Sequence, residues 1–272
     1  MAAVDRMSSI FATDRSRRQQ TEAPSPSEIM QVTPSHEIWD SLRTFAPAPE
    51  ALDRNKMIAA ARQDPAHVAF DVLRTRMTMA MKERGWHRVG ISSPTPSCGK
   101  SFVVGNLAIS FSRQEELKTV VMDLDLNSPS LAKYMGVTGC GSMAEYLAGN
   151  KPMEAHFMRP TKGLSQIGPN IAVGLNEQRE LFGSELLQYP STELALNEVQ
   201  AQLDPDIMIF DLPPVLSSDA VVALGSQLDC ILLVVSGERS KTADISEAER
   251  LIAETKPLLG VVMNKASGSL FG

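Results

Sequence analysis

The sequence is poor in the features that mark secreted and zinc-binding proteins. Its 272 residues contain three cysteines, Cys98, Cys140 and Cys230, which are odd in number and widely spaced. No group of cysteines and histidines has the spacing of a zinc site, so we expect neither a structural metal site nor a disulfide framework. This cysteine usage is typical of a reducing cytoplasm.

Long apolar segments are absent as well. The longest apolar run, residues 230–235, has the length of a buried strand, whereas a membrane-spanning helix needs roughly 18 apolar residues. The N-terminus lacks the continuous apolar stretch of a secretory signal. We therefore expect any association with a membrane to come through a partner protein.

The sequence also has no excess of positive charge. Its 26 basic and 32 acidic residues give a formal net charge of −6, which argues against a general electrostatic attraction to nucleic acid. Hydrophobic residues make up 43% of the chain, enough for one core of about 200 residues plus extra segments.

The composition divides the chain into two parts. Residues 1–60 are rich in serine, glutamine and charged residues and are interrupted by Pro24, Pro26, Pro34, Pro47 and Pro49. Such a stretch buries too little apolar surface to offset its ordering entropy, so we predict a flexible segment. Its short amphipathic pattern is interpreted as an apolar turn within a linker or as a docking motif for a partner. Residues 61–272 are predicted to form one folded domain.

Within the folded part, short apolar runs alternate with helical patterns. A helix is expected to begin near Asp64 and Pro65 and to end at Gly85. Further helices are expected at about 100–114, 191–203, 217–226 and 242–254. The β-branched runs predict buried strands at residues 89–91, 119–122, 171–173, 207–210, 231–235 and 261–263. This alternation predicts an α/β fold with a parallel sheet flanked by helices.

The segment 89–101 carries the clearest chemical signal, because it is predicted as a strand, a tight loop and the start of a helix. Backbone N–H groups in such a loop point at phosphate oxygens, and Gly99 lets the backbone approach closely. Lys100 would reach the β- and γ-phosphates and the Ser101 hydroxyl would coordinate Mg²⁺. The expected nucleotide-binding residues are Thr95, Pro96, Ser97, Cys98, Gly99, Lys100, Ser101 and Phe102.

This loop departs from the P-loop pattern G-x-x-x-x-G-K-[ST] at one position. Pro94 stands where the first glycine is expected. The alternative interpretation of the segment is a surface turn before a helix, and the strand-to-helix context favours the phosphate loop over that alternative.

Two other predicted strands end in carboxylates. Asp123 and Asp125 close the strand at 119–122, and Asp211 closes the strand at 207–210. Ligands of open α/β sheets bind at the carboxyl ends of the strands. A metal-bound triphosphate needs carboxylates nearby to hold the metal and position the nucleophile, so we predict that these acids serve the same site as Lys100. The alternative is that they only begin turns.

Together these motifs resemble the bacterial tyrosine kinases of capsule and exopolysaccharide assembly, which have a deviant P-loop of the MinD/ParA class. Further matching segments cover roughly residues 64–267, including 69–75, 126–131, 211–215, 218–220 and 260–264. The resemblance implies a cytoplasmic protein that binds ATP and Mg²⁺, sits at the inner membrane through a membrane-spanning polysaccharide co-polymerase, and can form a homo-oligomer.

The resemblance also implies roles for individual residues. Asp123 would activate the attacking hydroxyl with Asp125 in support, and Lys100 would assist catalysis at the phosphates. Asp211 would hold the metal through water, together with Ser101 and Asp123. Asn264 lies where relatives contact the adenine.

Three departures from the family affect these expectations. The family's ring-forming helix carries Glu-x-x-Arg-x-x-Arg, where this sequence has Val68, Asp71 and Arg74. We therefore expect the protein not to form that ring by itself. Asn127 replaces the arginine that usually follows the paired acids, and residues 265–272 hold none of the usual tail tyrosines.

The hypothesis favoured by the sequence is an ATP-binding regulator of exopolysaccharide export with weak ATPase or kinase chemistry. A fully active tyrosine kinase acting on other proteins is the first alternative. A MinD/ParA-like positioning ATPase is another, although such proteins usually have a lysine where this chain has Thr95. A scaffold without nucleotide chemistry is the last, and intact Lys100 and Ser101 speak against it.

Overall fold

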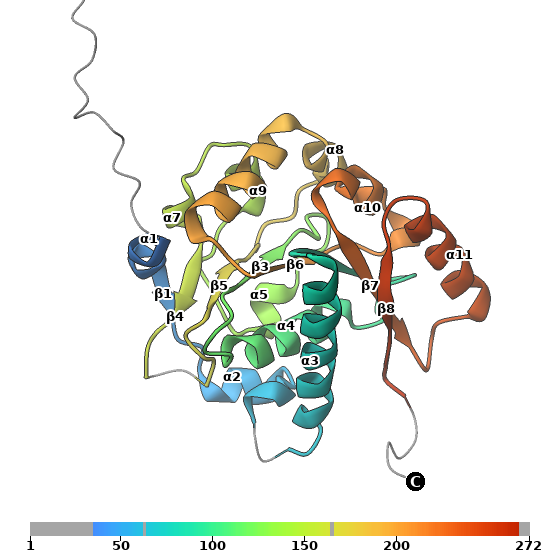
Figure 1. Ribbon diagram of the computed structural model, residues 1–272, viewed down its shortest axis with the longest axis horizontal. Helices are drawn as coiled ribbons and strands as arrows, with labels where there is room; N and C mark the ends of the chain where they lie inside the picture. The colour runs from blue at the N-terminus through green and yellow to red at the C-terminus, as the bar shows by residue number, and fades with distance from the viewer. Residues whose placement is uncertain (1–34, 62–63, 164–165, 267–272) are drawn as a thin grey trace, which may run out of the picture. The chain divides into compact units, whose positions relative to one another are not determined.

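A single mixed sheet organises the chain. The structure, a computed structural model, describes residues 35–61, 64–163 and 166–266, and in these ranges eight strands form one sheet (Figure 1). Their order across the sheet is β1-β4-β5-β3-β6-β2-β7-β8. The strands are β1 (Arg43–Phe45), β2 (Arg88–Ser92), β3 (Thr119–Asp123), β4 (Met158–Pro160), β5 (Ile171–Gly174), β6 (Ile207–Asp211), β7 (Cys230–Ser236) and β8 (Leu258–Asn264). Neighbouring strands run parallel, except that β4 and β5 are antiparallel.

Helices cover both faces of the sheet, so the predicted α/β class and the six predicted strands are confirmed. The described helices are α1 (Ser35–Ser41), α2 (Pro49–Arg54), α3 (His67–Arg84), α4 (Lys100–Ser112), α5 (Leu131–Tyr134), α6 (Met143–Leu147), α7 (Met153–His156), α8 (Gly183–Leu187), α9 (Pro190–Leu203), α10 (Ala220–Ala223) and α11 (Thr242–Ala253). The helix predicted at 217–226 is broken, because Ser218 adopts an extended backbone between a 3₁₀ turn and α10.

The two faces have separate apolar cores. On one face α3 and α4 pack with alternate strand residues such as Val121 and Ile209. On the other face α9 and α11 pack with the intervening residues, such as Met122 and Phe210. Every residue of β3 and β6 is buried, which is why their sequences are almost continuously apolar.

The register of the three central strands brings the predicted site together. Asp123 of β3 lies opposite Asp211 of β6, and Ile91 of β2 lies opposite Asp211 from the other side. The carboxyl ends of β3, β6 and β2 are therefore adjacent, with the phosphate loop leaving β2 beside both acidic strand ends.

The predicted boundary at residue 60 is too late. Residues 1–34 lie outside the described residues, but residues 35–60 form α1, β1 and α2 rather than a flexible segment. Strand β1 pairs with β4, and Trp39, Leu52 and Met57 are buried. The amide of Ala59 also donates to the Asn106 side chain on α4 at 2.9 Å. Proline misled the prediction, because Pro49 occupies the first position of α2, where its missing N–H costs nothing.

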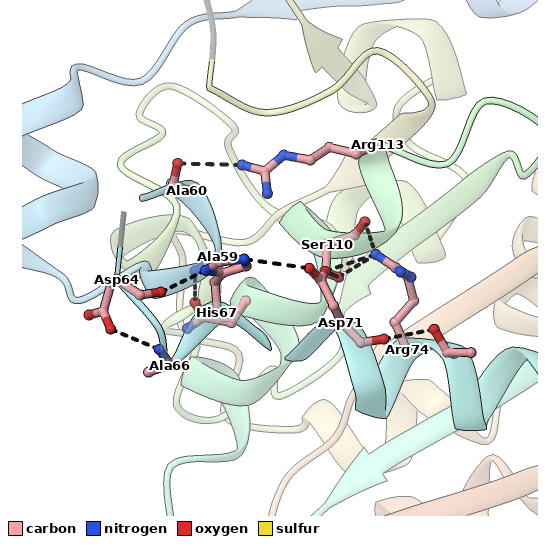
Figure 2. Close-up of polar contacts among 11 residues, drawn as sticks. Ala59, Ala60, Asp64, Ala66, His67, Asp71, Arg74, Ser110 and Arg113 are labelled. Carbon is pink, nitrogen blue, oxygen red and sulfur yellow. Dashed lines mark hydrogen bonds and ion pairs between the residues drawn. The ribbon is translucent and has the colours of Figure 1, made fainter. Parts of the chain in front are cut away.

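A polar network joins α3 to α4 (Figure 2). The Asp71 carboxylate accepts from the Arg74 guanidinium at 2.9 Å and from the Ser110 hydroxyl at 2.5 Å. Arg74 also donates to the Ser110 carbonyl at 3.2 Å, and its side chain is only 15% exposed. The arginine that the sequence shares with the ring-forming motif is thus engaged within its own subunit.

We predict that the purified protein does not assemble through α3, and that Arg74→Ala lowers stability without lowering the molecular mass. Removing the guanidinium takes away its hydrogen bonds to the partly exposed Asp71 carboxylate and to the Ser110 carbonyl, which should cost about 0.5–1.5 kcal/mol. Light scattering in the presence of ATP and Mg²⁺ gives the mass, and urea unfolding gives the stability. A ring-sized assembly that Arg74→Ala dissociates would contradict this prediction.

One buried histidine is expected to lower the stability of the folded protein at low pH. His156 is completely buried, stacks on the Tyr146 ring at a centroid distance of 5.6 Å, and both its ring nitrogens lack a hydrogen-bond partner in the described part of the chain. Burial, together with the nearby positive charges of Lys151 and Arg43, lowers the pKa of His156 to about 4. The imidazole is therefore neutral in the folded protein.

We predict a loss of stability on acidification that His156→Phe reduces. Because the folded pKa lies below the value of about 6.5 in the unfolded chain, protons bind the unfolded chain more tightly. This contribution is complete above pH 6.5 and is lost as the pH falls toward 4, by about 2.5 kcal/mol between pH 7.5 and 4.5. Urea unfolding of wild type and His156→Phe at both pH values measures it. An equal loss of stability in both proteins would show that His156 does not cause this pH dependence.

Candidate functional site

The phosphate loop connects β2 to α4 through a backbone that only certain residues tolerate. It leaves the sheet after Ser92 and reaches the first residue of α4, Lys100. Ser97 and Gly99 have positive φ angles of 66° and 90°. A Cβ atom at Gly99 would lie 2.1 Å from the Asn264 amide nitrogen, so glycine is required both by the φ angle and by the space.

The end of β8 holds this loop in place. The Asn264 amide donates to the Cys98 carbonyl at 3.0 Å, and the Lys265 ammonium donates to the Ser97 carbonyl at 3.0 Å. The side chain of Cys98 is buried and donates to the Thr95 carbonyl, as expected for a residue that fills the loop. Asn264 thus shapes the phosphate loop, and its contact with adenine stays a prediction.

Lys100 is surrounded by carboxylates. Its Nζ lies 2.6 Å from Asp125 Oδ2 and 3.3 Å from Asp211 Oδ1, and it donates to the Ser101 hydroxyl at 3.2 Å. The lysine side chain is 10% exposed. Burial by itself lowers the pKa of Lys100, but the charges of Asp211 and Asp125 outweigh it, so the pKa lies above the ordinary lysine value. Lys100 is therefore a fixed cation.

Asp123 lies behind this ion cluster. It is fully buried, and its two oxygens accept from the backbone amides of Asp125 at 3.2 Å and Leu131 at 3.1 Å. Burial and the charge of Asp211 raise the pKa of Asp123 well above its ordinary value, although Lys100 opposes the shift. Burial likewise raises the pKa of Asp211. The three predicted acids and Lys100 thus lie near one another. Asp125 and Asp211 contact the ammonium directly, and Asp123 lies behind them.

A hollow of about 380 Å³, the phosphate hollow, opens above the ion cluster. Its lining residues are Pro96, Ser97, Gly99, Lys100, Ser101, Asp125, Asn127, Ser128, Ser130, Tyr134, Pro213, Pro214, Ser217 and Ser218. Thr95, Cys98 and Phe102, which were also predicted to bind nucleotide, do not line this hollow, and their contact with nucleotide stays a prediction. Phe102 packs edge-on against the rings of Phe70 and Tyr134, and so supports the wall of the hollow.

Several lining residues were not predicted from the sequence. Asn127, Ser128 and Tyr134 come from the segment after the paired acids, and Ser217 and Ser218 come from the turn after Pro214. The segments 126–131 and 218–220 match the family in sequence, but no role was predicted for their residues. Their position directly after acidic strand ends was a usable signal, because such loops form the rim of sites in α/β folds.

The residues that line the hollow, together with Asp211 beneath it, suit a metal-bound phosphate. Asp211 Oδ2 and Asn127 Oδ1 are buried oxygens that lack a hydrogen-bond partner among the described residues. Oxygen ligands of this kind, with the Ser101 hydroxyl, are those Mg²⁺ prefers. The described residues contain no group of three or more His, Cys, Asp or Glu side chains placed to hold a metal alone. A metal here would therefore depend on phosphate oxygens to complete its shell, as is usual for Mg²⁺.

Comparison with known proteins defines the class. The ParA family model, described as NUBPL iron-transfer P-loop NTPase, matches residues 86–269, which include the phosphate loop, all three acids and Asn264. The kinase domain of Escherichia coli tyrosine kinase ETK is similar in structure, with a TM-score of 0.69 over 85% of this chain and 91% of that chain, at 22% identity. The chain is thus a P-loop NTPase of the ParA type, as predicted.

Sequence similarity places the chain more narrowly. It is 30% identical to tyrosine-protein kinase YwqD of Bacillus subtilis over 206 residues, covering 72% of this chain and 79% of YwqD. It is 31% identical to the putative tyrosine-protein kinase EpsB of Ralstonia solanacearum over 203 residues. The chain therefore belongs to the bacterial tyrosine kinase family.

The match with EpsB covers 74% of this chain but only 26% of EpsB, so the chain spans about a quarter of that relative. In the part of the chain that the structure describes, no helix combines the length and the apolar character that crossing a bilayer requires.

We predict that Lys100→Met destabilises the protein by about 3–5 kcal/mol at pH 7.5, because it leaves buried carboxylates without their cation. The loss should shrink as the pH falls, since the acids can then take up protons. Lys100→Met combined with Asp125→Asn should recover part of the stability by removing one of the opposed charges. Urea unfolding measures all three proteins, and a loss below about 1 kcal/mol for Lys100→Met would contradict the account.

Proposed function

We propose that this chain is the ATP-binding, kinase-like component of a machinery for exopolysaccharide or capsule polymerisation and export. It would act in the cytoplasm, at the inner membrane, together with a membrane-spanning polysaccharide co-polymerase. Membership of the bacterial tyrosine kinase family supports this proposal. The observation that carries it is the ion cluster, in which Lys100 contacts Asp125 and Asp211 beneath a hollow of phosphate size.

The proposed chemistry is phosphoryl transfer to a hydroxyl group. Lys100 and the backbone of the loop would hold the phosphates of ATP, and Ser101 and Asp211 would hold Mg²⁺. The metal would neutralise charge on the phosphates. Positioning and electrostatic stabilisation supply most of the rate enhancement in such reactions, and a carboxylate orients the attacking hydroxyl.

The position of the two paired acids favours a change in their predicted roles. Asp125 lines the hollow, whereas both oxygens of Asp123 are bound by backbone amides below it. We propose that Asp125 accepts the proton of the attacking hydroxyl and that Asp123 fixes the loop that carries Asp125. The earlier assignment of Asp123 as the activating group is the alternative.

The tyrosines of this sequence do not form a cluster. The 272 residues contain Tyr134, Tyr146 and Tyr189. Tyr146 is buried and donates to the Ala195 carbonyl at 2.8 Å, so its hydroxyl is inaccessible. We propose that the phosphate acceptor is a tyrosine of another protein, and that the ATPase or kinase activity of the isolated chain is weak.

A positioning ATPase is the second candidate function, and the match to the ParA family model favours it. The two functions predict different products, since a positioning ATPase releases phosphate and forms no phosphotyrosine. Thr95 supports the kinase proposal, because its side chain turns to Cys98 Sγ at 3.6 Å where positioning ATPases usually carry a lysine.

We predict that ATP with Mg²⁺ stabilises the protein, by roughly 2.7 kcal/mol at 100 times the dissociation constant. Lys100→Ala should remove most of this gain, because the lysine ammonium that would contact the phosphates is then missing. A thermal-shift series measures the gain for each protein relative to its own unliganded state. No shift of wild type at millimolar ATP would count decisively against the site.

The same proteins decide between the two candidate functions. Wild type and Lys100→Ala are incubated with ATP, Mg²⁺ and a tyrosine-containing polymer, and phosphotyrosine is mapped by mass spectrometry. Phosphotyrosine on the polymer that depends on Lys100 supports the kinase. Phosphate release without phosphotyrosine supports the positioning ATPase.

A further inference from the structure

A second hollow adjoins the phosphate hollow on the side of α2 and α5. Its volume is about 630 Å³. The side chain of Asn55, at the end of α2, donates to the Lys133 carbonyl of α5 at 2.5 Å, which ties the two walls together. The lining residues are Ala51, Arg54, Asn55, Pro129, Ser130, Ala132, Lys133, Gly136, Val137, Thr138, Asn176 and Glu177. We name it the acceptor hollow, for the use argued below.

The wall between the two hollows is the segment 128–131. Ser128 lines the phosphate hollow, Pro129 lines the acceptor hollow, and Ser130 lines both. The paired acids fix this wall, since the Ser128 amide donates to Asp125 Oδ1 and the Leu131 amide donates to Asp123 Oδ2, each at 3.1 Å. A molecule in the acceptor hollow would therefore lie next to the carboxylates that serve the phosphates.

Asn176 gives the acceptor hollow an unused hydrogen-bond donor. The residue is 1% exposed, and its carboxamide oxygen accepts from the backbone amides of Met143 at 3.2 Å and Gln178 at 3.1 Å. These two bonds fix the orientation of the side chain, because only the oxygen can accept from an amide. The Nδ2 group is left without a partner among the described residues. A buried donor of this kind calls for an acceptor atom, which a ligand or a water held with it can supply.

The charges of the acceptor hollow point to an anionic ligand. Arg54 and Lys133 are exposed, and neither has an acidic partner within 4.0 Å among the described residues. The one lining carboxylate, Glu177, is occupied by the amides of Gly139 at 3.2 Å and Cys140 at 2.9 Å. Two cations without an acidic partner and one residue with a spare amide donor thus line the hollow, on a protein whose net charge is −6.

We propose that the acceptor hollow binds acidic residues that flank the tyrosine of a protein substrate, so that this kinase selects tyrosines in acidic segments. This inference rests on the proposed function and adds the substrate class. Cations recognise acidic motifs by charge-assisted hydrogen bonds, and local complementarity is needed here because the overall negative charge repels an acidic chain. The shared wall would deliver the tyrosine hydroxyl of the bound segment to Asp125.

The test measures peptide binding directly by fluorescence polarisation, with no catalytic step. Three labelled seven-residue peptides carry one central tyrosine flanked on both sides by glutamate, glutamine or lysine. The glutamate peptide should bind wild type at least tenfold more tightly than the glutamine peptide. Arg54→Glu combined with Lys133→Glu should abolish this preference, and Arg54→Gln combined with Lys133→Gln should reduce it.

Arg76→Glu combined with Lys82→Glu is the matched control, because both residues are exposed on α3, line neither hollow, and give the same change in charge. It should keep the preference. Loss of the preference in the control as well, or no difference among the peptides with wild type, would overturn the proposal. A third result would also overturn it: inorganic pyrophosphate displaces the glutamate peptide from wild type, while the Arg54 and Lys133 variants bind that peptide as tightly as wild type does. This result would place the peptide in the phosphate hollow.

The thermal shift with ATP separates this proposal from the function on which it rests. Both pairs of charge variants should be stabilised by ATP as much as wild type, because Arg54, Lys133, Arg76 and Lys82 lie outside the phosphate hollow. An ATP shift without a peptide preference disproves the acceptor hollow alone. Absence of an ATP shift in wild type disproves the nucleotide site, whatever the peptides do.

Discussion

The ion cluster of Lys100 with Asp125 and Asp211, which Asp123 backs, is the interaction on which the rest of the site depends. Three carboxyl groups at the ends of two buried strands would repel one another strongly if all were ionised, and the one buried ammonium offsets part of that repulsion. The cluster exists because β3, β6 and β2 are neighbours in register. Binding of phosphates would require Lys100 to exchange carboxylate oxygens for phosphate oxygens, so the cluster holds the lysine in place and sets a cost for its release.

The cluster also links parts of the chain that are distant in sequence. Asp123 and Asp125 hold the wall of residues 128–131, which separates the two hollows. The end of β8 holds the phosphate loop through Asn264. A change in the charge of the cluster would therefore act on this wall as well as on the phosphates, if the proposed function holds. This arrangement gives a physical reason for a kinase-like protein to respond to nucleotide and to protein substrate together.

Sequence alone predicted six of the eight described strands, the phosphate loop and the acids at the strand ends, because each depends on local pattern. Buried parallel strands must be apolar along their whole length, and a glycine with positive φ must precede Lys100. Strands β1 and β4 were missed, since each has three residues and is defined by its partner rather than by its own sequence. Long-range packing likewise decided that residues 35–60 are ordered, that Arg74 turns inward and that Asn176 lines a hollow. None of these leaves a periodic signal.

A crystal structure of the protein with Mg²⁺ and a non-hydrolysable ATP analogue tests the central claim most directly. The account predicts that Lys100 Nζ leaves Asp125, from which it lies 2.6 Å away here, and contacts the β- and γ-phosphates. Asp211 Oδ2 should then face the metal or one of its waters, and Asp125 should face the γ-phosphate. A structure in which the analogue binds elsewhere, or in which Lys100 keeps both carboxylates while the phosphates lie out of its reach, would contradict the account.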